Sequence, residues 1–303
     1  MNKYILLFFA VFISCKSEKK VEKELTPKTI TTNEYELIKS GKDSKAVLIL
    51  FGGFGEDVAA IKTQFKIVDT AKRNNISLLL MNYSQKLWLE ASEKRNLAQL
   101  LQTTLEKYNL NKKAVFIGGF SSGGVVSLHI SNYIIGNKEF YIDPKGVFIV
   151  DSPIDLLALY KTSELNIKRN FSDVAVQESN WIIDTFNKKL GSPKDSISNY
   201  EKYSVYTMES NYTNNLNNLK NTKIRLYTEP DFTWWKKNRN ADVAQTNAYY
   251  IQNLSKTLKN RGFKNVEYIT TENKGYRANG DRHPHSWSII DTNNLVDWIF
   301  NKK

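Results

Sequence analysis

The chain has 303 residues, 41% of them hydrophobic, so it can bury a substantial core. This length is near the upper size of a single core, about 250–300 residues, and we expect one domain with room for an insertion. The net charge of +12 favours contact with anionic surfaces. Because the basic residues are scattered and no zinc-finger, homeodomain or RNA-binding signature is present, nucleic acid is not an expected partner.

The first residues have the pattern of an export signal. Lys3 precedes an apolar run over residues 4–13, which is too short to span a bilayer permanently. The run ends at a small residue and Cys15, the only cysteine in the chain, and resembles the lipobox of bacterial lipoproteins, where signal peptidase cuts before a lipidated cysteine. Phe12-Ile13 departs from that pattern, and an ordinary secretory signal with an unrelated cysteine is the alternative.

The resemblance implies that residues 1–14 are a signal peptide and that Cys15 is the lipidated N-terminus of a protein in the bacterial cell envelope, periplasmic or surface-exposed. Each buried methylene of an acyl chain contributes about 0.8 kcal/mol, so two or three chains would hold the protein durably at a membrane. Residues 15–32, rich in Lys, Glu and Thr, are expected to form a solvated tether. Residues 33–303 are expected to form the folded domain.

From Lys45 onward, short apolar runs alternate with longer amphipathic stretches. Strands are predicted over residues 46–51, 76–83, 114–120, 146–150, 223–228 and 266–270. Helices are predicted over residues 57–73, 87–108, 123–135, 241–259 and 289–300. Continuous apolar strands with crossover helices indicate a mostly parallel sheet with helices on both faces, and hence the α/β class.

The alternation is interrupted between Asp155 and Lys220, where helical spacing recurs over residues 156–160 and 174–190. We expect a mainly helical cap, over about residues 155–220, at the carboxyl edge of the sheet. There it would shape a binding cleft; an ordinary surface excursion is the alternative.

A strand, a turn and a helix are predicted in succession over residues 114–130, and the turn carries Gly119-Phe120-Ser121-Ser122-Gly123. This Gly-x-Ser-x-Gly pattern is typical of a nucleophile elbow, where the serine occupies a strained turn and the glycines avoid collisions with neighbouring backbone. A phosphate-binding glycine turn is the alternative, but no lysine follows and the dinucleotide spacing is absent. Ser121 is therefore the candidate nucleophile.

With this motif and the order of its strands and helices, the chain from residue 44 to 300 resembles the α/β-hydrolase superfamily. In that superfamily the oxyanion donors lie on the loop after an earlier strand, and LILFGGFGED, residues 48–57, resembles the usual His-Gly-Phe-Gly run without its histidine. The resemblance implies an oxyanion hole formed by the backbone N–H groups of Phe54 and Ser122, with Gly53 as a neighbouring candidate. Such donors typically contribute about 3–4 kcal/mol each to transition-state stabilisation.

A serine nucleophile needs a base within hydrogen-bond reach, and the chain has three histidines. His129 lies inside the helix after Ser121, where its side chain cannot turn back over the hydroxyl. His283 and His285 lie in a polar loop before the final helix, where the superfamily carries its base. His285 is favoured because a small and an aromatic residue follow it, while Pro284 restricts His283 to extended geometry; the order of loop and helix fits both.

A carboxylate must hold the base in one tautomer and stabilise its positive charge. Asp231 ends the run KIRLYTEPD at the position of the superfamily's acid and keeps the order nucleophile, acid, base. Glu229 in the same loop and Asp151, after the preceding strand, are the alternatives.

Trp234, Trp235 and Trp287 flank the candidate acid and base, so they could form an apolar or sugar-stacking wall of the cleft, or belong to the core. Two histidines separated by one proline, without a cysteine partner or a His-Glu-x-x-His motif, do not predict a metal site.

The expected reaction is hydrolysis of an ester through an acyl-enzyme on Ser121, without a metal or other cofactor. The expected partners are a small-molecule or polysaccharide ester and the membrane that holds the lipid anchor. The same fold also carries peptidases, and a lipoprotein that uses the scaffold only for binding is a further alternative. The complete order of nucleophile, acid and base speaks against that last alternative.

Overall fold

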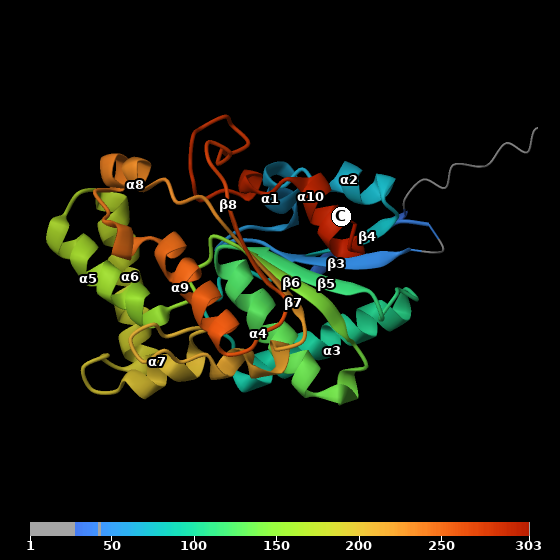
Figure 1. Ribbon diagram of the computed structural model, residues 1–303, viewed down its shortest axis with the longest axis horizontal. Helices are drawn as coiled ribbons and strands as arrows, with labels where there is room; N and C mark the ends of the chain where they lie inside the picture. Colours follow the sequence, from blue (N-terminus) through green and yellow to red (C-terminus); the bar gives the residue numbers. More distant parts are fainter. Residues whose placement is uncertain (1–27, 42–43, 303) are drawn as a thin grey trace, which may run out of the picture.

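The computed structural model describes residues 28–41 and 44–302, so the predicted signal peptide and Cys15 lie outside the described residues. One eight-stranded sheet runs through the molecule in the order β1-β2-β4-β3-β5-β6-β7-β8 (Figure 1). β1 and β2 run antiparallel to their neighbours, and all other pairs are parallel. The strands are β1 Lys28–Thr31, β2 Tyr35–Lys39, β3 Ala46–Phe51, β4 Ile76–Met81, β5 Val115–Phe120, β6 Pro144–Val150, β7 Lys223–Thr228 and β8 Val266–Thr270.

The six predicted strands are confirmed, and they form the parallel part of the sheet. β1 and β2 were not predicted, because both are short and carry polar residues that mask the alternation of a half-buried strand. β1 occupies residues that were expected to belong to the tether 15–32, so the sheet begins before the expected domain boundary at residue 33.

Helices cover both faces of the sheet, as predicted. One face packs against α1 (Val58–Gln64), α2 (Val68–Arg73) and α10 (Thr292–Phe300), and the other against α3 (Ala91–Lys107), α4 (Ser122–Gly136) and α9 (Asn247–Asn260) (Figure 1). Because both faces are covered, every residue of β3, β4 and β5 is buried. The helix predicted over residues 57–73 is two helices, α1 and α2, separated by a short break.

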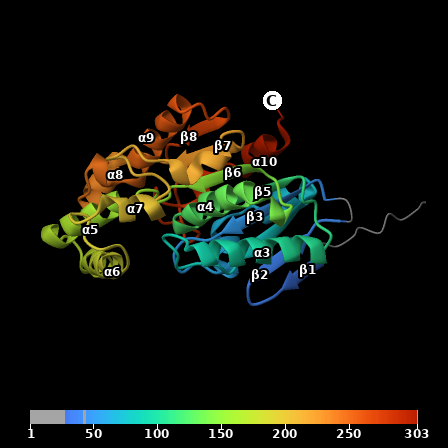
Figure 2. The same cartoon turned by 90° about the horizontal axis from the view of Figure 1, so that it is seen from below.

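The segment between β6 and β7 forms a mainly helical cap, with α5 (Leu156–Arg169), α6 (Asp173–Leu190) and α7 (Ile197–Tyr203). These helices lie together beyond one end of the sheet, beside α8 (Phe232–Arg239) (Figure 2). The cap residues Leu157, Phe186 and Tyr200 belong to one hydrophobic cluster, to which Leu87 from the chain between β4 and α3 also contributes. The cap helices therefore pack together at the carboxyl edge of the parallel strands.

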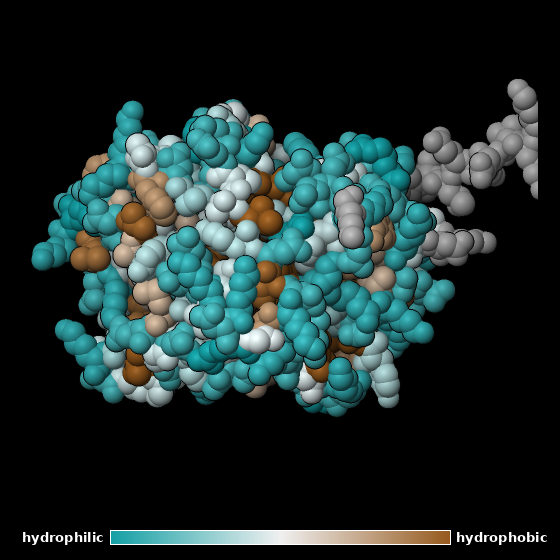
Figure 3. Space-filling view, in the orientation of Figure 1, coloured by the Kyte–Doolittle hydropathy of each residue, from teal (hydrophilic) through white to brown (hydrophobic). Residues whose placement is uncertain are grey.

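The surface is largely hydrophilic on the face that Figure 3 shows, with hydrophobic groups over the cap end and toward the middle. Most of the large exposed hydrophobic side chains belong to the cap and the loops beside it: Phe54, Leu165, Phe171, Val174, Trp181, Phe232 and Val243. Among the described helices, none combines the length and apolar character needed to cross a membrane.

His129 joins α4 to the cap and is buried, as expected for a packing residue. Its Nε2 lies 2.9 Å from the carbonyl oxygen of Tyr203 at the end of α7, and since that oxygen can only accept, Nε2 carries the proton. Burial, with a smaller contribution from the positive charge of Lys94, lowers the pKa of His129 to about 3. The imidazole therefore stays neutral in the folded protein.

This lowered pKa makes stability depend on pH, because unfolded His129 binds a proton below its ordinary pKa of about 6.5 and the folded residue does not. Its contribution is fully present above pH 6.5 and is lost as the pH falls toward 3. His129→Gln retains an N–H donor that does not titrate. Between pH 6 and pH 5, urea denaturation should show the wild type losing about 1 kcal/mol more than His129→Gln. Equal losses in the two proteins would contradict the assignment.

Candidate active site

Ser121 lies at the sharp turn between β5 and α4, with φ 52° and ψ −125°. Its N–H donates to the carbonyl oxygen of Val150 at the end of β6, 2.9 Å away, which holds the turn against the sheet. A Cβ at Gly119 would lie 2.2 Å from the carbonyl oxygen of Gly123, and one at Gly123 would lie 2.3 Å from that of Gly52. Both glycines of the motif are therefore needed, since any side chain would push the turn from β3 or from α4.

The loop after β3 carries the expected oxyanion donors. The N–H of Gly53 donates to Glu56 Oε2 at 2.8 Å, so this candidate is already occupied. The N–H of Phe54 has no hydrogen-bond partner within the described part of the chain. Ser122 is the first residue of α4, where backbone N–H groups have no partner in the helix. The N–H groups of Phe54 and Ser122, the two predicted donors, thus make no hydrogen bond within the described residues.

His285, the favoured candidate base, contacts a carboxylate, but this carboxylate is not that of the favoured candidate acid, Asp231. Its Nδ1 lies 2.6 Å from Oδ2 of Asp151, which follows β6 and is buried. The other oxygen, Oδ1, accepts from the hydroxyl of Thr228 at 3.1 Å. A carboxylate only accepts hydrogen bonds, so Nδ1 carries a proton, and in the neutral imidazole the lone pair is then on Nε2. The imidazole also packs on Phe120, the residue before Ser121, with ring centroids 4.5 Å apart.

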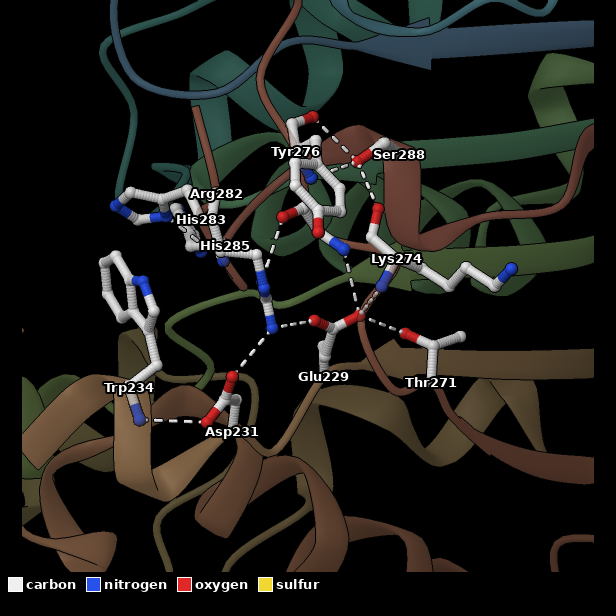
Figure 4. Close-up of polar contacts among 11 residues, drawn as sticks. Glu229, Asp231, Trp234, Thr271, Lys274, Tyr276, Arg282, His283, His285 and Ser288 are labelled. Carbon is white, nitrogen blue, oxygen red and sulfur yellow. Dashed lines mark hydrogen bonds and ion pairs between the residues drawn. The ribbon is translucent and has the colours of Figure 1, made fainter. Parts of the chain in front are cut away.

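The expected contact between Asp231 and His285 is not made among the described residues. Asp231 instead caps α8 through the N–H of Trp234, and its Oδ2 lies 2.7 Å from Nη2 of Arg282 (Figure 4). Asp231, the favoured acid, therefore does not contact His285, and the carboxylate that does is the alternative, Asp151. The physical reason is that a nearby guanidinium and the start of a helix attract the Asp231 carboxylate.

Glu229, the other alternative acid, is also turned toward the chain that carries the histidines. Its buried side chain pairs with Arg282 at 2.5 Å and accepts from the backbone N–H groups of Lys274 and Gly275 (Figure 4). Arg282 in turn donates to the carbonyl oxygen of Gly275. The two carboxylates that follow β7 thus fix the loop before His285 instead of contacting the imidazole.

His283 supports His285 and does not replace it. Its Nδ1 accepts a hydrogen bond from the backbone N–H of His285 at 3.2 Å. Burial, followed by electrostatic interactions with the neighbouring His285, Arg277 and Arg239 side chains, lowers the pKa of His283 to about 3. His283 therefore remains a neutral acceptor at ordinary pH, whereas His285 is the histidine that contacts a carboxylate.

The three tryptophans expected near the acid and base have different environments. Trp287 is buried and stacks on Phe65, with ring centroids 4.6 Å apart, so it belongs to the core. Its Nε1 donates to Glu56 Oε2 at 3.1 Å, the same oxygen that holds Gly53. Trp234 and Trp235 pack against His283. Sequence reasoning missed Glu56, although an acidic residue directly after a glycine-rich loop is a signal that could have pointed to it.

No group of three or more His, Cys, Asp or Glu side chains in the described ranges is arranged to hold a metal ion.

No family model matches the chain, and no curated protein matches it in sequence. Solved structures do resemble it. An esterase structure from Rhizomucor miehei is 15% identical, with a TM-score of 0.53 over 91% of this chain and 82% of that one. The Francisella virulence factor BioJ gives the same identity and TM-score over 91% and 84%. An esterase of the bacterial hormone-sensitive lipase family is 12% identical, with a TM-score of 0.53 over 93% and 85%.

At these identities the likeness concerns the fold, and it extends over nearly the whole described chain. The order of the strands, the turn at Ser121 and the helices on both faces agree with it. The chain therefore has the α/β-hydrolase fold, with a helical cap between β6 and β7.

Proposed function

We propose that the protein is a serine hydrolase that cleaves carboxylic esters, with Ser121 as nucleophile, His285 as base and Asp151 as acid. The observation that carries the proposal is the 2.6 Å contact between His285 Nδ1 and Asp151 Oδ2, on an imidazole packed against the residue before Ser121. That contact leaves Nε2 as the proton acceptor at the carboxyl edge of the sheet. Several of the structures that resemble this chain are named as esterases, which agrees with ester hydrolysis.

In the first half of the reaction, Ser121 Oγ attacks the ester carbonyl carbon while its proton passes to His285 Nε2. The carbonyl oxygen becomes an oxyanion and accepts from the N–H groups of Phe54 and Ser122. When the C–O bond breaks, the proton on Nε2 passes to the leaving alkoxide. Water then donates a proton to Nε2, attacks the acyl-enzyme and releases the carboxylic acid, while the proton returns to Ser121.

Asp151 supports this cycle by its charge and its rigidity. Its backbone N–H donates to the carbonyl oxygen of Tyr227, and its backbone carbonyl accepts from Asn247. With Thr228 on the second carboxylate oxygen, the side chain has one orientation, and it stabilises the imidazolium that forms when Ser121 attacks.

Ser121→Ala should lose at least about 10⁴-fold in kcat on p-nitrophenyl acetate, because no other group can form the acyl-enzyme. A fluorophosphonate probe should label the wild type and leave Ser121→Ala unlabelled. The control is Ser198→Ala, an exposed serine in α7, which should be labelled like the wild type. Absence of labelling in the wild type, or labelling of Ser121→Ala, would reject the serine mechanism and favour a scaffold that only binds.

Asp151→Asn should lower kcat by about 10⁴-fold, since an amide at this position no longer fixes the Nδ1–H tautomer of His285. Asp231→Asn is the matched control: asparagine also caps a helix, and the change removes only the charge beside Arg282, so the loss should stay below about tenfold. Steady-state kinetics on p-nitrophenyl acetate measures both. A larger loss for Asp231→Asn would return the role of acid to Asp231.

We also propose that the protein is a lipoprotein of a bacterial cell envelope, anchored through Cys15. The support comes from the sequence, because residues 1–27 lie outside the described part. A host given labelled palmitate should label the wild type and not Cys15→Ser, and the variant should move from the membrane to the soluble fraction. Fluorophosphonate labelling of Ser121 should persist in that variant. An unlabelled wild type would contradict the anchor and leave the hydrolase proposal untouched.

A further inference from the structure

A groove of about 300 Å³ lies between α6 of the cap and the chain that joins β4 to α3. This volume is at the lower end of the range of small-molecule sites. Two indole rings and four charged side chains line the groove: Trp88, Trp181, Lys86, Lys189, Glu90 and Glu93. None of them was singled out by the sequence motifs.

The groove adjoins the proposed catalytic centre through Phe54. The ring of Phe54, whose N–H is a proposed oxyanion donor, contacts the indole of Trp181 edge-on, with centroids 5.1 Å apart. Both side chains are 45% exposed, so neither is committed to the core. A substrate whose carbonyl oxygen reaches the N–H of Phe54 therefore has the Trp181 ring beside it.

The charged side chains of the groove are paired with one another. Lys189 Nζ lies 2.6 Å from Glu90 Oε1, and Lys86 pairs with Glu93. Trp88 Nε1 donates to the same Glu90 oxygen at 3.2 Å. Two ammonium groups and two carboxylates sum to zero charge, so the groove offers donors and acceptors without selecting an anion or a cation.

The combination of indole rings and ion pairs favours some kinds of ligand over others. A fatty acyl chain would cover two ion pairs with methylene groups and leave them desolvated, which is unfavourable. A lipid phosphate or another anion would find no net positive charge. A neutral sugar ring fits both features, because its C–H face packs on an indole while its hydroxyl groups donate to the carboxylates and accept from the ammonium groups.

We propose that this groove, which we call the indole groove, binds the carbohydrate part of an acylated, neutral oligosaccharide, and that Trp181 is its stacking platform. The inference rests on the proposed ester hydrolysis and deepens it: the sugar is the alcohol side of the ester, and the acyl carbonyl lies at Ser121. The enzyme would then remove acyl groups from neutral glycans.

Binding can be measured separately from turnover by using full-length Ser121→Ala. Isothermal titration calorimetry with three O-acetylated tetrasaccharides, of xylose, mannose and N-acetylglucosamine, should show binding of at least one. In the Ser121→Ala background, the additional substitution Trp181→Ala should raise the Kd for that glycan about tenfold. Trp181→Phe should raise it less, because an aromatic ring remains. Phe171→Ala, which changes another exposed aromatic residue of the cap, should leave the Kd unchanged. Failure of all three glycans to bind would overturn the proposal.

Kinetics with active Ser121 distinguishes the occupants. Trp181→Ala should lower kcat/KM for the bound acetylated glycan about tenfold relative to p-nitrophenyl acetate. If it instead lowers kcat/KM for p-nitrophenyl octanoate relative to the acetate, the groove holds an acyl chain and the sugar assignment is wrong. Because the calorimetry uses a variant without the nucleophile, glycan binding without any esterase activity would reject the proposed function and keep the groove.

Discussion

The close approach of three backbone segments around Ser121 is the constraint on which the rest of the site depends. The end of β3, the turn after β5 and the start of α4 meet where only glycine fits at positions 119 and 123. This contact holds a non-glycine residue at a positive φ and brings the N–H groups of Phe54 and Ser122 to the same edge of the sheet. The sheet is rigid there because β3 and β5 are buried on both faces, so the strain of the turn is carried by the core.

The parallel strands and their helices could be predicted because each is a continuous buried run with a length typical of its type. The strands at the antiparallel edge were missed, since Lys28–Thr31 is almost entirely exposed and has no apolar pattern to detect. The sharp turn at Ser121 could be predicted because the Gly-x-Ser-x-Gly motif depends on the local backbone conformation. The sequence placed both candidate bases, His283 and His285, in one loop before the final helix. Only the contacts in the structure distinguish them, because His285 contacts Asp151 and His283 accepts from the backbone N–H of His285.

The order of residues in the sequence could not identify the carboxylate that contacts His285, because three carboxylates lie just after two neighbouring strands. Asp151 follows β6, and Glu229 and Asp231 follow β7. Which of them meets His285 depends on partners that come from elsewhere in the chain. Arg282 takes up both Glu229 and Asp231, while Asp151 is left to the imidazole and Thr228. The tryptophans follow the same rule: those near the candidate acid and base in sequence pack on one another or in the core, whereas Trp88 and Trp181 line one groove.

The Glu56 carboxylate links two parts of the proposed active site. One oxygen of its carboxylate accepts both from Gly53, beside the proposed oxyanion donor, and from Trp287, two residues after the proposed base. The segments that carry the proposed oxyanion donor and the proposed base thus share a single support, although more than 200 residues separate them in the sequence. A substitution near Gly53 and a substitution near Trp287 therefore both affect the Glu56 carboxylate. We expect the free-energy changes of two such substitutions to be coupled and not to add as independent losses.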